Sequence, residues 1–188
     1  MSALGDAGAI LTKCEKTASK IKSLRNHGRG SEAIIGRNSR CDHIQAAVLH
    51  LKLENAEKLN DQRKQVAKLY YKHLPWLEDA MPNTKFIELS SWHLFPLKLE
   101  SIEVRKALQQ YLQENDIGCA PYYEKSMSQE PALKGFQGEF EEAEKFAGRV
   151  LCLPITPFLN EESVKVISNK IRSFLGEQHR RTSQLTVN

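Results

Sequence analysis

Apolar side chains recur at helical spacing in several stretches of the chain, with charged residues between them. The predicted helices are residues 14–26, 42–74, 101–114, 140–148 and 160–175. Residues 42–74 form the longest periodic segment, for which Asp42 is a suitable N-cap and Pro75 the end. Gly176 indicates the end of the last helix. A helix as long as the second one is too large for a small domain to cover, so we expect its first half to pack on another domain or subunit.

Shorter apolar runs between these helices predict strands at residues 92–99, 119–123 and 150–153. Pro96 lacks a backbone N–H, which favours an edge position for the first of them. Residues 3–12 suit a short strand or turn that needs a neighbouring sheet. The pattern therefore predicts an α/β fold, in which a long helix is followed by a small antiparallel sheet with helices packed against it.

The composition is that of an ordinary globular protein, with 188 residues, 40% of them hydrophobic and 27% charged. No apolar run approaches the roughly 20 residues that span a bilayer, and the first residues lack the pattern of a signal peptide, so we expect a cytoplasmic protein. The four cysteines form no Cys-x-x-Cys pair, which argues against a zinc ribbon and against a disulfide framework.

The net charge of +4 is concentrated near the N-terminus. Residues 1–40 hold eight basic and three acidic side chains, so they carry +5 and the remaining residues carry −1. A basic stripe of this kind can bind nucleic acid. Here no aromatic residue is interleaved with the basic ones and no nucleic-acid motif accompanies them. We therefore expect a solvated helix face and an anion-binding loop rather than a nucleic-acid partner.

The loop before the longest predicted helix carries the most informative chemistry. Asn38 offers an amide and Arg40 a guanidinium just before the helix start at Asp42. Helix-start N–H groups, a side-chain amide and a cationic fork together favour an anion, above all a phosphate. The alternative is that Asn38 is a turn residue and Arg40 a surface charge at the helix end.

The literal sequence of this loop resembles a motif of the DegT/DnrJ/EryC1/StrS family, the pyridoxal-phosphate (PLP) sugar aminotransferases. In that family a Gly-x-Asn-x-Arg loop leads into a helix that opens with Gln-Ala-Ala. Four further segments resemble motifs of the same family, in the same order along the chain. They are residues 4–10 (LGDAGAI), 24–28 (LRNHG), 91–95 (SWHLF) and 149–155 (RVLCLPI).

The resemblance implies an α/β fold in which this chain is the C-terminal small domain of a fold-type I PLP-dependent transferase. It divides the chain into three parts. These are residues 1–40, a remnant of the large PLP-binding domain with a partner-facing loop, residues 41–176, the long helix and the small domain, and residues 177–188, a disordered tail.

The family's catalytic lysine has no counterpart in the printed chain. In the family the lysine that forms the Schiff base with PLP lies just upstream of the segment that matches residues 4–8, whereas the first lysine here is Lys13. We therefore expect this chain to hold no catalytic residue and to make no covalent bond to PLP. We expect it to correspond to the C-terminal half of such an enzyme.

Residue roles carried over from the family fall on four positions. Asn38 would reach the PLP phosphate in the neighbouring subunit's site, and Arg40 would face the nucleotide or phosphate of the substrate. Tyr123 and His93 are the further substrate-binding candidates. The alternative for His93, at the start of a predicted strand, is a structural group that is satisfied by a hydrogen bond.

The chain departs from the family where the family has two histidines, because Tyr122 and Ser128 stand in their places. These departures indicate a divergent substrate or a copy under relaxed constraint. A metal site is not expected. His43 and His50 are seven residues apart on one predicted helix, and His50 and Glu54 are four residues apart, but no third ligand is evident.

Two hypotheses about function follow. In the first, the chain is part of an aminotransferase that moves an amino group from an amino acid, usually glutamate in the family, to a nucleotide-linked keto-sugar. Its partner is then a second copy, as in a homodimer, or a missing N-terminal half. In the second, the chain is a non-catalytic family remnant that acts as a binding or dimerisation module.

Overall fold

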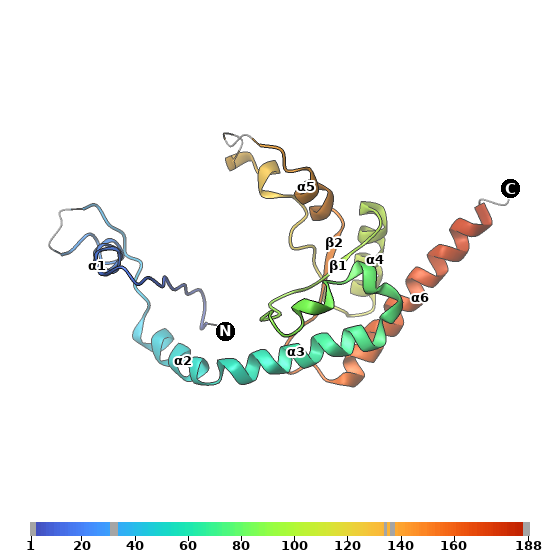
Figure 1. Cartoon of the computed structure of the whole chain (residues 1–188), viewed down its shortest axis with the longest axis horizontal. Helices are drawn as coiled ribbons and strands as arrows, with labels where there is room; N and C mark the ends of the chain where they lie inside the picture. The colour runs from blue at the N-terminus through green and yellow to red at the C-terminus, as the bar shows by residue number, and fades with distance from the viewer. Residues whose placement is uncertain (1–2, 31–33, 134, 136–137, 186–188) are drawn as a thin grey trace. The chain divides into compact units, whose positions relative to one another are not determined.

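The computed structural model describes residues 3–30, 34–133, 135 and 138–185, and the side chains of the last helix as far as Gly176. The chain forms two compact units, Met1–Glu57 and Lys58–Asn188. Figure 1 shows the helices and strands of each unit. None of the described helices combines the length and the apolar composition that crossing a membrane requires.

The first unit contains two helices and a long loop between them. α1 spans Glu15–Leu24 and α2 spans His43–Glu54. Ser23 is the one buried side chain among the described residues of this unit, whereas Leu11 and Ile35 are 95% and 99% exposed. Residues 3–12 form no strand, and the backbone bends at Leu4 and Gly5. The apolar side chains of this unit therefore have no core of their own among the described residues.

The predicted helix over residues 42–74 is wrong in one respect, because it is two helices. α2 ends at Glu54 and α3 spans Ala56–His73, with Asn55 between them at φ −103° and ψ 7°. The Asn55 side-chain amide donates to the carbonyl of Leu51 at 3.0 Å. An asparagine that bonds to a nearby carbonyl offers the backbone an alternative to the helix, which accounts for the break.

The N-cap prediction for α2 is confirmed. Asp42 has extended backbone angles and forms a capping box with Gln45, in which the Asp42 N–H donates to Gln45 Oε1 at 3.1 Å. Reciprocal bonds of this kind satisfy N–H groups that the first turn of a helix leaves without partners. The sequence thus fixes where α2 begins.

The second unit is built around a two-stranded antiparallel sheet. β1 spans Phe95–Lys98 and β2 spans Val150–Leu153, and Phe95 faces Leu153 in the register. Both strands were predicted, with wider bounds for β1. The third predicted strand, residues 119–123, is wrong: only Ala120 pairs with Cys152, in an isolated bridge. Pro121 has no N–H to continue the ladder, which explains why the pairing stops there.

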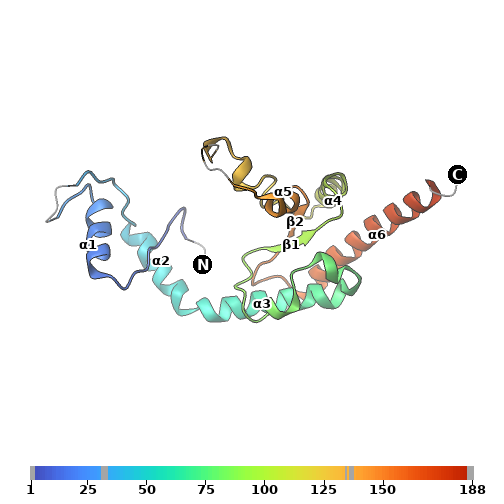
Figure 2. The ribbon, with the colours of Figure 1, turned by 45° about the horizontal axis from the view of Figure 1, so that its top comes forward.

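Helices cover this sheet. α4 spans Ile102–Glu114, α5 spans Glu141–Ala147 and α6 spans Glu161–Leu185. β1 and β2 lie between α3 and α5 in both Figure 1 and Figure 2. Ser101 caps α4 as predicted, since its hydroxyl accepts the N–H of Val104 at 3.2 Å. Short 3-10 turns connect the rest, at Pro75–Ala80, Thr84–Phe86, Met127–Gln129 and Pro131–Leu133.

The core of the second unit draws on α3, both strands, α4 and α6. Tyr70 stacks on Phe95 with ring centroids 4.7 Å apart, and its hydroxyl donates to the carbonyl of Pro154 at 2.8 Å. Each large side chain buried this way contributes about 1.5–3 kcal/mol. The largest fully buried apolar side chains are Tyr70, Phe95, Leu74, Leu97, Leu108, Leu112, Leu151, Ile171, Val150 and Val164.

The start of α6 is tied to the end of α3 by charge. Glu161 Oε1 lies 2.8 Å from Lys72 Nζ and 3.1 Å from His73 Nε2. The hydrogen bond from Lys72, and then that from His73, hold the pKa of the Glu161 carboxyl below its usual range. The Lys72 contact is exposed to solvent and the His73 contact is partly buried, so the exposed pair contributes little free energy and mainly orients the two helices.

The prediction that the last helix ends at Gly176 is wrong, because α6 continues to Leu185. Gly176 keeps a helical backbone, whereas glycine ends a helix only where the chain turns into the left-handed region. A glycine inside a helix costs about 1 kcal/mol relative to alanine, which the flanking turns can offset. Of the predicted disordered tail, residues 177–185 are therefore helical, and residues 186–188 lie outside the described residues.

Candidate functional site

The loop that carries Asn38 and Arg40 is held against the end of α1. Arg37 N–H donates to the carbonyl of Leu24 at 2.8 Å, His27 N–H donates to that of Arg37 at 3.0 Å, and Ser39 N–H donates to that of Arg25 at 2.9 Å. These bonds pair residues 36–40 with residues 24–28. Backbone hydrogen bonds thus join two of the sequence motifs, the Asn38 loop and residues 24–28, in the first unit.

Two glycines make this close pairing possible. A Cβ atom on Gly28 would lie 1.7 Å from the carbonyl oxygen of Ile34, and a Cβ on Gly36 would lie 2.1 Å from the backbone nitrogen of Gly28. Gly28 also has a φ of 77°, in the left-handed region that favours glycine. No other residue type fits at these positions without moving the backbone.

Gln45 joins a third motif to the same place. Its Nε2 donates to the carbonyls of Leu4 at 2.9 Å and Asp6 at 3.2 Å, while its Oε1 accepts the N–H of Asp42. One side chain therefore caps α2 and holds residues 4–6 beside the helix start. The segments 4–10, 24–28 and 36–47, which are far apart in the sequence, meet within one unit.

Arg40 and Asn38 differ in how they are held. Both side chains are exposed. Arg40 Nη1 donates to the side-chain oxygen of Asn26 at 3.1 Å, so its guanidinium is oriented by the neighbouring motif. Asn38 pairs with Asn26 through the backbone only, and its amide has no hydrogen-bond partner among the described residues. Asn38 is therefore available to a ligand, and Arg40 keeps further N–H groups for one.

Two hollows flank this loop. The larger, of about 700 Å³, lies between residues 6–12, α1 and Gln45. The smaller, of about 420 Å³, is lined by the last turns of α1 and the loop that follows. Lys22, Arg25 and Arg40 line both hollows, whereas Asn38 lines neither. Three cations thus stand where the two hollows meet.

The other two predicted site residues lie in the second unit. Tyr123 is 73% exposed and packs edge-to-face on Tyr122, with ring centroids 5.6 Å apart. His93 is exposed and follows Trp92, which is buried just before β1. The structure therefore brings Asn38 and Arg40 together in one unit and places His93 and Tyr123 in the other.

Ser128, which the sequence resemblance sets against a family histidine, forms hydrogen bonds within the chain. Its hydroxyl donates to Glu144 Oε1 at 2.6 Å and lies 2.6 Å from the hydroxyl of Ser126, which is buried. This chain of hydrogen bonds ties the loop after Tyr123 to α5. The side chain is thus occupied by the protein itself.

Arg105 supports the Tyr123 segment, and the sequence analysis missed it. Its guanidinium is buried, with Nε donating to the carbonyl of Gly148 at 3.1 Å and Nη1 donating to Gln109 at 2.8 Å and to Glu124 at 3.2 Å. The sequence pattern does indicate its burial, because Arg105 lies on the same face of α4 as the buried residue Leu108. A cation within an apolar stripe indicates a buried polar anchor.

The cysteines and histidines assemble no further site among the described residues. No group of three metal-ligating side chains occurs there, and His50 and Glu54 form an exposed pair 3.7 Å apart. Burial raises the pKa of the Cys119 thiol to about 11. The hydroxyl of Thr17 lowers the pKa of the exposed Cys14 thiol.

Comparison with known proteins places this geometry in context. The model of the DegT/DnrJ/EryC1/StrS aminotransferase family matches residues 1–172. The erythromycin biosynthesis sensory transduction protein EryC1 of Saccharopolyspora erythraea is 35% identical over 172 residues, which is 87% of this chain and 46% of the relative. The dTDP-3-amino-3,4,6-trideoxy-alpha-D-glucose transaminase of Streptomyces venezuelae is 31% identical over 93% of this chain and 48% of its own length.

A solved structure agrees with these matches. The crystal structure of DesV from S. venezuelae, in complex with a ketimine intermediate, has a TM-score of 0.76 and 30% sequence identity. The match covers 92% of this chain and 47% of that one. The chain spans about half the length of the relatives it matches.

Proposed function

Because the chain belongs to the DegT/DnrJ/EryC1/StrS aminotransferase family, we propose that it is the C-terminal part of a PLP-dependent aminotransferase for nucleotide-linked keto-sugars. The amino group comes from an amino acid. The S. venezuelae relative, named as a transaminase of a dTDP-linked sugar, supports this substrate class. The part that precedes Leu4 in the whole enzyme supplies the lysine on which the chemistry depends.

One observation carries the proposal. Three segments that match family motifs converge in the first unit, where Gly28 and Gly36 let the Asn38 loop pack directly on the end of α1. Backbone hydrogen bonds hold these segments together, and the side chains of Asn38 and Arg40 remain exposed. A loop that only connects two helices does not require such close backbone contact, so the contact supports a role for the loop in binding.

The donors in this loop suit a phosphate-bearing cofactor. When bound, PLP supplies the electron sink for amino-group transfer. Asn38 offers an amide N–H without a competing partner among the described residues, and Arg40 offers a guanidinium that Asn26 orients. Neither residue is paired with a carboxylate of the described residues. In the proposed enzyme Asn38 binds the cofactor phosphate of the neighbouring subunit, and Arg40 binds the phosphate or nucleotide of the substrate.

The second unit supplies further substrate contacts in this proposal. Tyr123 presents a largely exposed ring and hydroxyl beside Tyr122, and His93 is exposed at the entry to β1. The Arg105–Glu124 and Ser128–Glu144 bonds hold the segment that follows Tyr123. The enzyme works as a homodimer, because the Asn38 loop serves a site in the neighbouring subunit.

A chimera tests the proposal. Residues 4–188 are joined to the N-terminal half of the S. venezuelae transaminase, and PLP absorbance and transfer from glutamate to a dTDP-linked keto-sugar are measured. N38A is expected to weaken PLP binding about tenfold or more, because a hydrogen bond to a charged group is lost. R40A is expected to raise the KM for the sugar nucleotide by a similar factor and to leave PLP binding nearly unchanged.

R37A is the matched control, since Arg37 is an exposed cation of the same loop that lines neither hollow. It is expected to leave both measurements within about twofold, as for other surface substitutions. A chimera that folds as a dimer but binds no PLP contradicts the proposal. Equal effects of all three substitutions contradict the roles given to Asn38 and Arg40.

The second candidate function is a non-catalytic binding or dimerisation module. The replacement of both family histidines by Tyr122 and Ser128 favours it, together with the use of Ser128 as an internal tie to Glu144. It is distinguished by a chimera that dimerises and binds PLP but transfers no amino group. In that case the isolated chain self-associates without any cofactor, as sedimentation velocity would show.

A further inference from the structure

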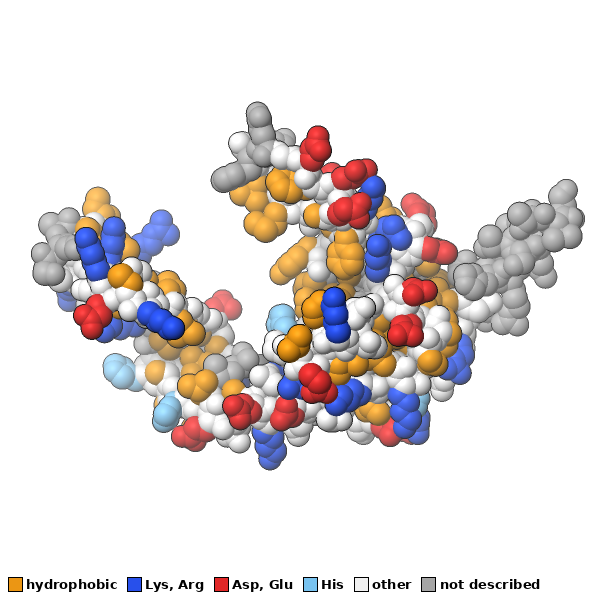
Figure 3. Space-filling view, viewed as in Figure 1, with side chains coloured by type: hydrophobic (Ala, Val, Ile, Leu, Met, Phe, Trp, Pro, Cys, Tyr) orange, Lys and Arg blue, Asp and Glu red, His pale blue; other side chains and the backbone are white. Residues whose placement is uncertain are grey.

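The smaller hollow of the first unit gathers an unusual concentration of positive charge. Its lining contains five basic side chains, which are Lys20, Lys22, Arg25, Arg29 and Arg40. Figure 3 shows Lys and Arg side chains gathered over α1. The rest of its described lining is small or polar, and no carboxylate of the described residues belongs to it. We call it the α1 hollow.

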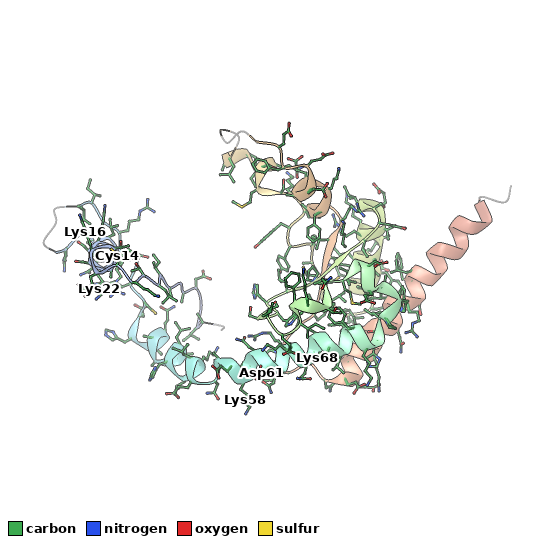
Figure 4. The ribbon with its side chains drawn as sticks, viewed as in Figure 1. Cys14, Lys16, Lys22, Lys58, Asp61 and Lys68 are labelled. Carbon is green, nitrogen blue, oxygen red and sulfur yellow. The ribbon has the colours of Figure 1, made fainter. Side chains whose placement is uncertain are left out.

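Among the described residues, these cations lack the carboxylate partners that several cations elsewhere in the chain have. Lys68 on α3 lies 2.7 Å from Glu88, and Lys64 lies 3.1 Å from Asp61. No carboxylate of the described residues lies within ion-pair distance of any basic side chain of the α1 hollow. Figure 4 labels an example of each kind, Lys22 on α1 and Lys68 on α3.

The helix dipole explains only part of this charge. A cation in the last turn of a helix, such as Lys22, complements the partial negative charge of the terminal carbonyls. Here two of these carbonyls, those of Leu24 and Arg25, already accept N–H groups from the loop. Several further cations around a satisfied helix end repel one another unless an anion lies between them.

The backbone of the α1 hollow is also fixed. The buried Ser23 hydroxyl donates to the carbonyl of Arg29 at 2.9 Å, and the carbonyl of Ser23 accepts the N–H of Gly28 at 2.9 Å. Gly30 has a φ of 153° and lies so close that a Cβ would be 3.0 Å from Ser23 Oγ. The backbone of Arg29 is therefore held beside α1, and Asn26 orients the guanidinium of Arg40.

We propose that the α1 hollow binds a small, phosphate-rich anion of the chemistry of a diphosphate group. Arginine forks match the oxygens of phosphate groups in pairs, and the lysines add charge at their rim. A volume of about 420 Å³ suits a small ligand. Single-stranded nucleic acid is disfavoured, because its binding sites stack bases on aromatic side chains and the lining has none. Except for Arg40, the site uses residues that the proposed aminotransferase function does not need.

The test uses the whole 188-residue chain and inorganic pyrophosphate as the probe. Isothermal titration measures the affinity, and backbone amide chemical shifts of Ser23 and Gly30 locate the binding. K20Q/R29Q is expected to weaken pyrophosphate binding about thirtyfold or more, because charge-assisted hydrogen bonds are lost. The matched control K13Q/K16Q removes the same charge from outside the lining. It is expected to change the affinity by less than about threefold, because salt screens distant charges.

Further arms identify the source of the anion. If dTDP or UDP binds at least about tenfold more tightly than pyrophosphate and displaces it, the diphosphate belongs to a nucleotide, and equal affinities indicate a free phosphate compound. Three results overturn the proposal. They are absence of saturable pyrophosphate binding, equal losses in the two double variants, and tighter binding of single-stranded RNA with a steep salt dependence. Each result is read on the isolated chain, so it is independent of whether the chimera transfers amino groups.

Discussion

Replacing Arg105 by methionine tests how the segment that carries Tyr123 is held. The Arg105 guanidinium is 2% exposed and donates to the buried carbonyl of Gly148 as well as to Gln109 and Glu124. Methionine keeps the length and the apolar stem but removes every donor. The change therefore separates the hydrogen bonds of Arg105 from its packing.

The magnitude follows from which partners are buried. Leaving a buried carbonyl such as that of Gly148 without a donor costs about 1–3 kcal/mol, and the loss of the bond to Gln109 adds about 1 kcal/mol. Relief of the buried charge offsets part of this cost. Glu124 is 61% exposed, so its ion pair with Arg105 contributes no more than about 1 kcal/mol. We expect R105M to lower the free energy of unfolding by about 2–3 kcal/mol and E124Q to lower it by less than 1 kcal/mol.

Urea unfolding followed by tryptophan fluorescence measures the difference, because Trp92 is 2% exposed and reports on the core of the second unit. R105M is expected to lower the midpoint without changing the slope, and E124Q to leave the midpoint nearly in place. If both variants lose the same free energy, the buried bond to Gly148 is not the main contribution. A loss below about 1 kcal/mol for R105M refutes the reasoning altogether.

Three further predictions concern the loop, the pH dependence and the thiols. G28A is expected to raise the hydrogen-exchange rates of the loop amides at least tenfold, because alanine in the left-handed region costs about 1–2 kcal/mol and its Cβ would also clash with the backbone. The control G8A, which has open space around its Cβ, is expected to leave these rates unchanged. The depressed pKa of Glu161 stabilises the fold above the usual carboxyl value near 4.5, so stability is expected to fall as the pH drops through the folded-state pKa, and E161Q to flatten that part of the urea-midpoint profile against pH. At neutral pH Cys14, exposed and with a lowered pKa, is expected to react with a maleimide at least about a hundredfold faster than Cys119, and equal rates, read by mass spectrometry, contradict this.

Local sequence signals predicted most of the elements of the second unit. Ser101 caps α4, β2 has the predicted bounds, and the apolar stripe of α6 points into the core. These features depend on periodicity and on capping groups within a few residues, which a single sequence displays directly. The family resemblance, based on five short motifs, is confirmed by the match over residues 1–172.

The errors lie at residues whose type permits more than one backbone conformation. Asn55 breaks a continuous helical pattern through one side-chain bond, and Pro121 ends a pairing that the apolar run favoured. Gly176 has the residue type of a helix end but keeps a helical backbone. In each case the apolar periodicity or the residue type alone does not show which conformation the backbone takes.

The sequence by itself determined the class of fold and the family, and it singled out the loop of Asn38 and Arg40 as the candidate anion site, because helical periodicity, capping residues and short motifs are properties of neighbouring residues. Only the tertiary structure decided which of these segments meet. In the structure Gln45 hydrogen-bonds to Leu4, and residues 36–40 pair with residues 24–28. Cations of α1 and of the loops line one hollow. Such contacts join residues up to 41 positions apart, and their free energy depends on the distances between atoms that only the folded chain brings close together.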